Sequence, residues 1–270
     1  MFIVKVPGIN GLGKTKGCEL AGDGMIRELR KIYTNQEEKI IDVDSLDLEE
    51  IHLDNSNLEL SADLIYKNSL KSFETKPKIA FLGGDHSISY HTTKAFMDYC
   101  KNAEKEPCLI VFDAHPDCMK PVDNNFPTHE EWLRGLIEAG FPTKNILLVG
   151  SRNSALEERR FMKENKIRAI SMSQFVDEIG EVCDVIMEFS DKKELYISID
   201  IDSIDPAFAP STGYPEPGGF TSKDFLYLVQ RLNKIKNLRA MDIVEINAEK
   251  DKEKNNLTLK LGAKILSEFI

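Results

Sequence analysis

Short apolar runs of strand-like composition alternate with amphipathic stretches of helical length, and this alternation constrains the fold more than any other feature. The expected strands span residues 78–82, 108–112, 145–149, 168–172, 194–199 and 238–243. The expected helices span residues 87–101, 128–139, 155–166, 222–235 and 257–269. Several of the strands are apolar at nearly every position, as strands covered on both faces are. We therefore expect an α/β fold, a three-layer sandwich in which a mostly parallel sheet carries helices on both faces.

The length and charge of the chain narrow its class. A chain of 270 residues allows one large domain, and no Pro- or Ser-rich linker divides it, so we expect a single domain over residues 1–270. The net charge of −10 argues against nucleic acid as a partner, since a backbone binder needs a basic face. No apolar run approaches the roughly 18 residues of a membrane span. The five cysteines are scattered and form no Cys-x-x-Cys pair, which indicates a reducing, cytoplasmic location.

Two segments read as neither helix nor strand, namely residues 120–127 and residues 206–219. Each follows a cluster of Asp and His at the end of an expected strand. Ligands of open α/β sheets bind beyond the carboxyl ends of the strands, so we expect both loops to be functional. The acidic stretch 42–54 is expected to be a solvated edge or loop.

A phosphate-loop pattern occurs near the N-terminus, where residues 8–15, from Gly8 to Thr15, satisfy G-x-x-x-x-G-K-[ST]. Phosphate binding requires a helix that begins at Lys14 and Thr15 and points its N-terminus at the phosphates. Three further glycines follow by residue 24, and each costs a helix about 1 kcal/mol relative to alanine. A glycine-rich turn after the first strand is the favoured interpretation, and a nucleotide-binding protein remains the alternative from another class.

Three motifs carry the chemistry, and each closes an expected strand. They are Gly83-Gly84-Asp85-His86-Ser87, Asp113-Ala114-His115-Pro116-Asp117, and Ser198-Ile199-Asp200-Ile201-Asp202-Ser203-Ile204-Asp205-Pro206. Residues two apart in an extended chain point to the same side, so the acids and histidines within each motif can converge. The candidate set is His86, Asp113, His115, Asp117, Asp200 and Asp202. Asp205, before a proline, is interpreted as a structural turn residue.

Four carboxylates placed together repel one another unless cations compensate them. Two divalent ions would do so, and a set rich in oxygen with one histidine for each metal favours Mn²⁺ or a similar ion over structural zinc. The sequence therefore predicts a binuclear metal site at the carboxyl ends of three strands.

These motifs resemble those of the ureohydrolase family, the arginases, agmatinases and their relatives, in the same order along the chain. The resemblance runs from about residue 79 to the C-terminus and implies an arginase-like fold. It implies that His86, Asp113, Asp117 and Asp200 hold one Mn²⁺, and that Asp113, His115, Asp200 and Asp202 hold the other. It further implies hydrolysis of a guanidino C–N bond, which releases urea and an amine.

Two further residues match family positions. Glu245 resembles the glutamate that pairs with the substrate guanidinium, a planar cation well matched by a carboxylate. His129 resembles the family's proton-shuttling histidine, although it could instead be a helix-start residue without chemistry. Trp132 and Phe126 either line the far end of the pocket or, in the case of Trp132, belong to the core.

Departures from the family pattern bear on the substrate. Arginases carry an Arg-Asp-x-Asp stretch that reads the α-amino group, whereas this chain has Arg152-Asn153-Ser154-Ala155. The difference argues against arginine and favours a decarboxylated guanidine, with agmatine as the best substrate. Arginine, guanidinobutyrate, formiminoglutamate and other guanidino or formimino compounds stay open, as does a relative that binds metal without catalysis. The resemblance also suggests a homo-oligomer, a trimer or hexamer.

Overall fold

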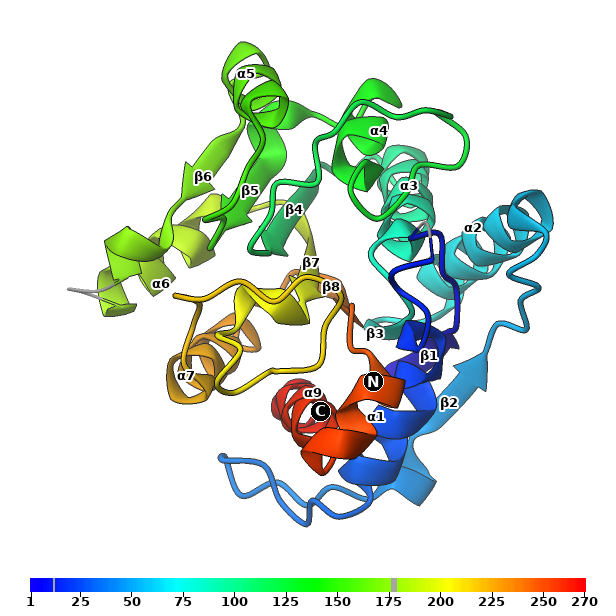
Figure 1. Cartoon of the computed structure of the whole chain (residues 1–270), viewed down its shortest axis with the longest axis vertical. Coiled ribbons are helices and arrows are strands. Elements are labelled where there is room, and N and C mark those ends of the chain that lie inside the picture. The colour runs from blue at the N-terminus through cyan, green and yellow to red at the C-terminus, as the bar shows by residue number, and fades with distance from the viewer. Residues whose placement is uncertain (12, 176–178) are drawn as a thin grey trace.

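A single parallel sheet organises the molecule (Figure 1). The computed structural model describes residues 1–11, 13–175 and 179–270. Eight strands lie in the order β2-β1-β3-β8-β7-β4-β5-β6, and every pairing between them is parallel. Their bounds are β1 Phe2–Val6, β2 Asp47–Glu50, β3 Ile79–Gly83, β4 Pro107–Phe112, β5 Ile146–Val149, β6 Arg168–Ile170, β7 Glu194–Asp200 and β8 Leu238–Val244.

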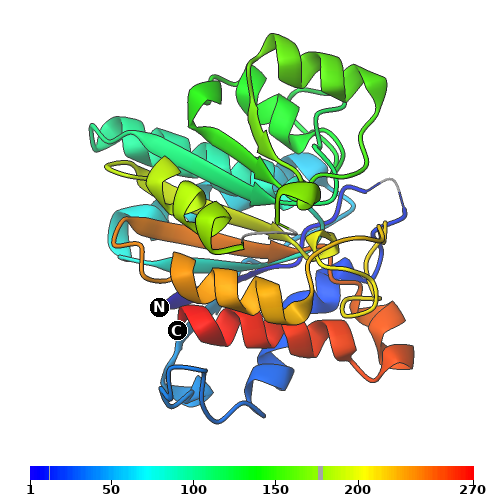
Figure 2. The same ribbon diagram turned by 90° about the vertical axis from the view of Figure 1, so that its left-hand side faces the viewer.

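Helices cover both faces of the sheet, so the expected three-layer sandwich is confirmed (Figures 1 and 2). One face carries α1 Ala21–Leu29, α6 Ile179–Phe189, α7 Ser222–Leu232 and α9 Leu257–Phe269. The other carries α2 Leu58–Thr75, α3 Ser87–Asn102, α4 Trp132–Glu138 and α5 Leu156–Glu164. A short helix, α8 Ala248–Asp251, follows β8.

Strand β4 shows why the strand sequences are apolar throughout. Cys108, Ile110 and Phe112 point into one core, whereas Leu109 and Val111 point into the core on the opposite face. Successive side chains of a strand face opposite sides, so a strand covered by helices on both faces needs an apolar residue at every position.

Helix α1 was not among the helices expected from the sequence, and it begins at Ala21 rather than at Lys14 and Thr15. Gly22 and Gly24 lie inside this helix despite the low helix propensity of glycine. A Cβ atom at Gly24 would lie 2.6 Å from Leu259 Cδ2 on α9, so the glycine permits the close contact between the two helices. Burial of the helix face offsets the weak intrinsic helix propensity.

Other expected elements are shifted or newly found. The acidic stretch 42–54 contains β2, an edge strand whose four residues are all exposed. Helix α4 begins at Trp132, so residues 128–131 precede it, and the helix expected over 222–235 ends at Leu232. The strand expected over 168–172 ends at Ile170. The loops 120–127 and 206–219 are irregular, as expected, and a bridge between Ile204 and Phe220 closes the second one.

Strands β3, β8, β7 and β4 are consecutive neighbours in the sheet. Because they are parallel, their carboxyl ends meet at one edge, and the three motifs lie directly after β3, β4 and within the end of β7. The register pairs Val111 with Ser198 and Ser198 with Asp242, which brings residues far apart in the sequence side by side.

Candidate metal centre and pocket

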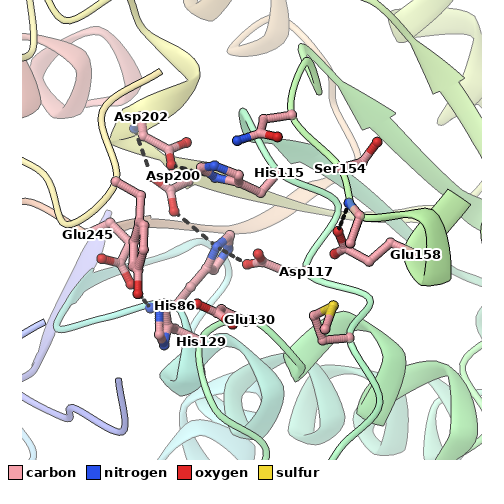
Figure 3. Close-up of a pocket in the computed structure, with 14 residues that line it drawn as sticks. His86, His115, Asp117, His129, Glu130, Ser154, Glu158, Asp200, Asp202 and Glu245 are labelled. Carbon is pink, nitrogen blue, oxygen red and sulfur yellow. Dashed lines mark hydrogen bonds and ion pairs between the residues drawn. The ribbon is translucent and has the colours of Figure 1, made fainter. Parts of the chain in front are cut away.

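The first group of candidate ligands surrounds His86 (Figure 3). Its Nδ1 atom lies 3.0 Å from Asp117 Oδ2 and 3.2 Å from Asp200 Oδ2, the two contacts drawn in Figure 3. Asp113 Oδ2 lies 3.1 Å from the same nitrogen. His86 is fully buried. The structure therefore brings one imidazole nitrogen and three carboxylates together, as the sequence predicts.

The second group surrounds His115. Its Nδ1 atom lies 2.9 Å from Asp202 Oδ2 and 3.6 Å from Asp113 Oδ1. Ligand atoms of His86, Asp113 and Asp200 lie within 4.8 Å of one another, and so do those of Asp113, His115 and Asp202. Asp113 is shared by the two groups.

Backbone N–H groups at the strand ends orient three of these carboxylates. The Oδ1 atom of Asp113 accepts from His115 N at 2.7 Å. The Oδ1 atom of Asp202 accepts from Ala114 N at 3.0 Å, and that of Asp200 accepts from Asp202 N at 2.7 Å. In each carboxylate, Oδ1 accepts from a backbone N–H group and Oδ2 faces an imidazole. These backbone hydrogen bonds fix the orientation of the three side chains.

The clustering perturbs the pKa values of the group. Burial, followed by the negative charge of Asp113, raises the pKa of Asp117 to about 7. Burial and the charge of Asp202 raise the pKa of Asp200 well above its usual range. Burial would lower the pKa of His115, but its contacts with Asp113 and Asp202 outweigh burial and raise it to about 12. In the protein by itself, bound protons therefore offset the negative charge of this cluster. A metal cation can offset that charge instead.

Trp132 contacts two members of the first group, Asp117 and His86. Its Nε1–H donates to Asp117 Oδ2 at 2.8 Å, and its ring lies 4.6 Å from that of His86. Trp132 is fully buried, and neither it nor Phe126 lines the pocket within the described part of the chain. Trp132 is therefore a core residue that contacts two candidate ligands.

A pocket of about 310 Å³ opens above the two groups. Glu245 lies on its wall, directly after β8, and is 3% exposed. Its Oε1 atom accepts from His86 N at 2.9 Å, which leaves Oε2 beside the pocket and 4.0 Å from Cys18 Sγ. Burial, followed by the charge of Asp85, raises the pKa of Glu245 well above its usual range.

His129 lies on the same pocket wall and is also buried. Neither ring nitrogen has a hydrogen-bond partner among the described residues, and Nε2 lies 3.6 Å from Glu130 Oε1. Burial lowers the pKa of His129, so the ring is neutral near pH 7. Tyr214 stacks on it with ring centroids 5.5 Å apart and an angle of 25° between the ring planes.

Several pocket residues were not identified from the sequence. Tyr214 lies in the 206–219 loop, which was expected to be functional, but the sequence does not show which of its residues reaches the pocket. Glu158, on α5, is buried and accepts from Ala155 N at 2.8 Å and Cys118 N at 3.0 Å. Its place in an amphipathic helix gave no signal for a pocket residue.

The loop containing Asp205 is fixed by polar contacts. Asp205 accepts from Ala207 N at 2.9 Å and Gly218 N at 2.7 Å, in agreement with a structural role. The guanidinium of Arg152 donates to the carbonyl oxygens of Asp202, Glu216 and Pro217. These contacts place the 206–219 loop, and with it Tyr214, over the pocket.

The glycine-rich stretch 8–15 does not have the geometry of a phosphate loop. No helix begins at Lys14 and Thr15 within the described residues, since the next helical turn, a 3₁₀ helix, covers Cys18–Leu20. Thr15 Oγ1 instead donates to Asp85 Oδ2 at 2.7 Å, and Lys14 Nζ lies 4.9 Å from the centre of the Tyr214 ring. The stretch is a turn at the pocket rim, and its Leu12 lies outside the described residues.

Two candidate residues have left-handed backbone conformations. Asp117 has φ 50° and Glu245 has φ 64°, backbone values that residues other than Gly, Asn and Asp rarely adopt.

All five cysteines are free and buried. No helix in the described parts of the chain is long and apolar enough to cross a bilayer.

The fold and site together define an α/β protein with a histidine and carboxylate centre at the carboxyl edge of a parallel sheet. A family model described as the Arginase family matches residues 1–270, and the chain belongs to this family. Arginase from Staphylococcus aureus (strain MRSA252) is 27% identical and aligns with 91% of this chain and 87% of its own. Arginase 1, mitochondrial, from Oryza sativa subsp. indica is 31% identical over 188 residues, 70% of this chain. The alignment covers only 53% of that rice protein, so the chain spans about half its length.

Solved structures share the fold across the whole chain. Formimidoylglutamase from Bacillus subtilis superimposes with a TM-score of 0.86 at 23% identity, covering 99% of this chain and 85% of its own. Agmatine ureohydrolase of Thermoplasma volcanium superimposes with a TM-score of 0.83 at 24% identity, covering 99% and 87%. At these identities the likeness establishes the arginase-like fold alone.

Proposed function

We propose that the protein is a binuclear, metal-dependent hydrolase that cleaves a guanidine C–N bond to give urea and an amine, with agmatine as the best substrate. The observation that carries the proposal is the convergence of two imidazoles and four carboxylates below a pocket whose wall holds Glu245 and His129. Membership of the arginase family supports the same reaction class.

The donor set fits a pair of divalent ions. His86 Nδ1 and Asp113 Oδ2 are buried and make no aligned hydrogen bond within the described structure, although charged groups surround both atoms. We assign His86, Asp113, Asp117 and Asp200 to one ion and Asp113, His115, Asp200 and Asp202 to the other. Oxygen ligands with one imidazole per ion favour Mn²⁺. Such ions, when bound, polarise the substrate and lower the pKa of water.

Glu245 is assigned to bind the guanidinium. Because Oε1 is occupied by His86 N, Oε2 is the atom available to accept from a substrate N–H group. Because this carboxylate is largely buried, a cation at hydrogen-bond distance would be bound strongly and would keep Glu245 ionised.

His129 is assigned to move a proton to the departing amine. Its buried, neutral ring has nitrogens free to accept and donate, which a proton shuttle requires. Tyr214, stacked on the ring, fixes the plane in which those nitrogens lie.

The charged residues of the pocket bear on the substrate tail. Glu130 and Glu158 line it together with Asn153 and Ser154, and no lysine or arginine is among its lining residues in the described structure. When metal ions neutralise the four candidate aspartates, these two glutamates supply the remaining charge for the tail. A cationic tail, such as the ammonium of agmatine, suits this charge better than a carboxylate does.

The test is urea release from agmatine, arginine, guanidinobutyrate and guanidinopropionate by Mn²⁺-loaded and chelator-stripped protein. We expect metal-dependent urea from agmatine above the other three. Release from arginine instead would place the protein with the arginases and show that the tail argument is wrong. If all four are inert while two Mn²⁺ ions bind per chain, formimino compounds are the next substrates to assay.

A pair of variants tests the assigned ligands. Asp200→Asn removes a shared carboxylate, and we expect it to lose bound Mn²⁺ and activity while the fold survives. Asp191→Asn, a change at an exposed position, is the matched control and should retain both. Full activity in Asp200→Asn would show that the site assignment is wrong.

Size-exclusion chromatography with light scattering tests the further proposal that the chain forms trimers or hexamers.

A further inference from the structure

A buried hydrogen-bond chain runs from His86 into the sheet. His86 Nε2 lies 2.9 Å from Ser198 Oγ, and Ser198 Oγ lies 2.7 Å from Asp242 Oδ1. All three residues are inaccessible to solvent. Ser198 and Asp242 face each other across β7 and β8, where the strand register pairs them.

Asp242 is a buried carboxylate with no cationic partner in direct contact among the residues that the structure describes, and it accepts from four donors. Its Oδ1 atom receives Ser198 Oγ and Ile199 N, and its Oδ2 atom receives Ser89 Oγ at 2.8 Å and Tyr196 OH at 2.9 Å. An ionised carboxylate only accepts hydrogen bonds, so this arrangement sets the direction of every bond around it.

The direction matters at Ser198. A serine hydroxyl carries one hydrogen, and at this position that hydrogen goes to Asp242. The hydroxyl can therefore only accept from His86, which requires the proton of the ring to be on Nε2. Nδ1, the atom that faces Asp113, Asp117 and Asp200, is then left with a lone pair for a metal ion.

We propose that Ser198 and Asp242 are positioning residues that fix the tautomer and ring orientation of His86 through this chain, so that Nδ1 is presented to a divalent metal ion. The proposal rests on the proposed metal site and concerns its metal affinity, independently of the substrate. Removing such a partner of a metal-binding histidine typically lowers metal affinity about 10- to 100-fold.

The structure offers a matched pair of variants. Ser198→Ala and Ser89→Ala each remove one fully buried hydroxyl that donates to Asp242, but of these two hydroxyls only that of Ser198 is bonded to the His86 imidazole. Chelator-stripped proteins are titrated with Mn²⁺, and free Mn²⁺ is followed by electron paramagnetic resonance. We expect Ser198→Ala to weaken Mn²⁺ binding about 10- to 100-fold and Ser89→Ala to leave it unchanged. Equal losses in both variants, or none in Ser198→Ala, would overturn the proposal.

A second readout follows the proton directly. In zinc-loaded protein with ¹⁵N-labelled histidine, we expect a slowly exchanging Nε2–H signal from His86, assigned by its loss in His86→Asn. The signal should persist in Ser89→Ala and exchange rapidly in Ser198→Ala. If Ser198→Ala does not fold, Asp242→Asn, which keeps an acceptor but loses the charge, should show an intermediate loss of Mn²⁺ affinity. Wild-type affinity in Asp242→Asn would overturn the role of Asp242. Failure of wild-type protein to bind Mn²⁺ would instead reject the proposed function.

Discussion

We predict that His91 makes the stability of the protein sensitive to acid. It lies on α3 with its ring edge against that of Tyr90, at a centroid distance of 5.0 Å. Burial, followed by the charge of Lys94, lowers the pKa of His91 from 6.5 to about 4. The unfolded chain therefore binds a proton at this residue between those pH values, and the folded protein does not. The stability that neutral His91 allows is complete above pH 6.5 and is lost as the pH falls toward 4.

The magnitude follows from the pKa gap. Each unit corresponds to about 1.4 kcal/mol, so the full effect is about 3 kcal/mol, of which about 2 kcal/mol is lost between pH 7 and pH 4.5. In His91→Gln this loss should be absent. Urea unfolding of both chelator-stripped proteins, at about pH 7 and about pH 4.5, measures it as the change in the difference between their free energies of unfolding. The exposed His52 provides the control variant His52→Gln, for which no change is expected. A wild-type minus His91→Gln difference that is the same at both pH values would refute the reasoning.

Three further predictions concern the site and its rim. Thr15→Val removes the hydrogen bond to Asp85 and should lower the free energy of unfolding by about 1.5–3 kcal/mol in urea titrations, with no ATP binding by either protein in calorimetry. Trp132→Phe removes the donor to Asp117 and should weaken Mn²⁺ binding at least about 10-fold, whereas unchanged affinity would show that the indole contact is incidental. Tyr214→Leu removes the ring that stacks on His129 and should lower kcat for urea release. Tyr214→Phe keeps the ring and should retain most of the wild-type kcat. Equal losses of kcat in the two variants would assign the effect to the hydroxyl.

The sequence predicts the central strands and the ligand cluster for one physical reason. Residues such as Cys108 to Phe112 are apolar because two helical layers bury them, and the acids and histidines follow directly where each strand ends. Because parallel strands end at the same edge, motifs separated by more than 80 residues could be expected to meet. The cluster of His86, Asp113 and Asp200 confirms that expectation of proximity.

The features that were missed depend on contacts between distant segments. Helix α1 contains Gly24 because α9 packs closely against it at this residue, and that neighbour lies more than 200 residues away in the sequence. Tyr214 reaches the pocket because Arg152 and Asp205 fix its loop through backbone atoms, which leave no side-chain pattern to read. The hydrogen-bond chain from His86 to Asp242 likewise depends on the register of β7 and β8, which pairs Ser198 with Asp242.

The left-handed backbone at Glu245 lowers the stability of the fold, whereas the proposed chemistry requires a carboxylate at this position. A glutamate at φ 64° costs the folded state about 1 kcal/mol that a glycine would not. The same residue buries a carboxylate beside Asp85, and burial together with that neighbouring charge raises its pKa well above the usual range. Variants selected only for resistance to heat should therefore accumulate glycine at residue 245 before they change the apolar strands around it. They would gain thermal tolerance and lose the carboxylate that we propose binds the guanidinium in the same step.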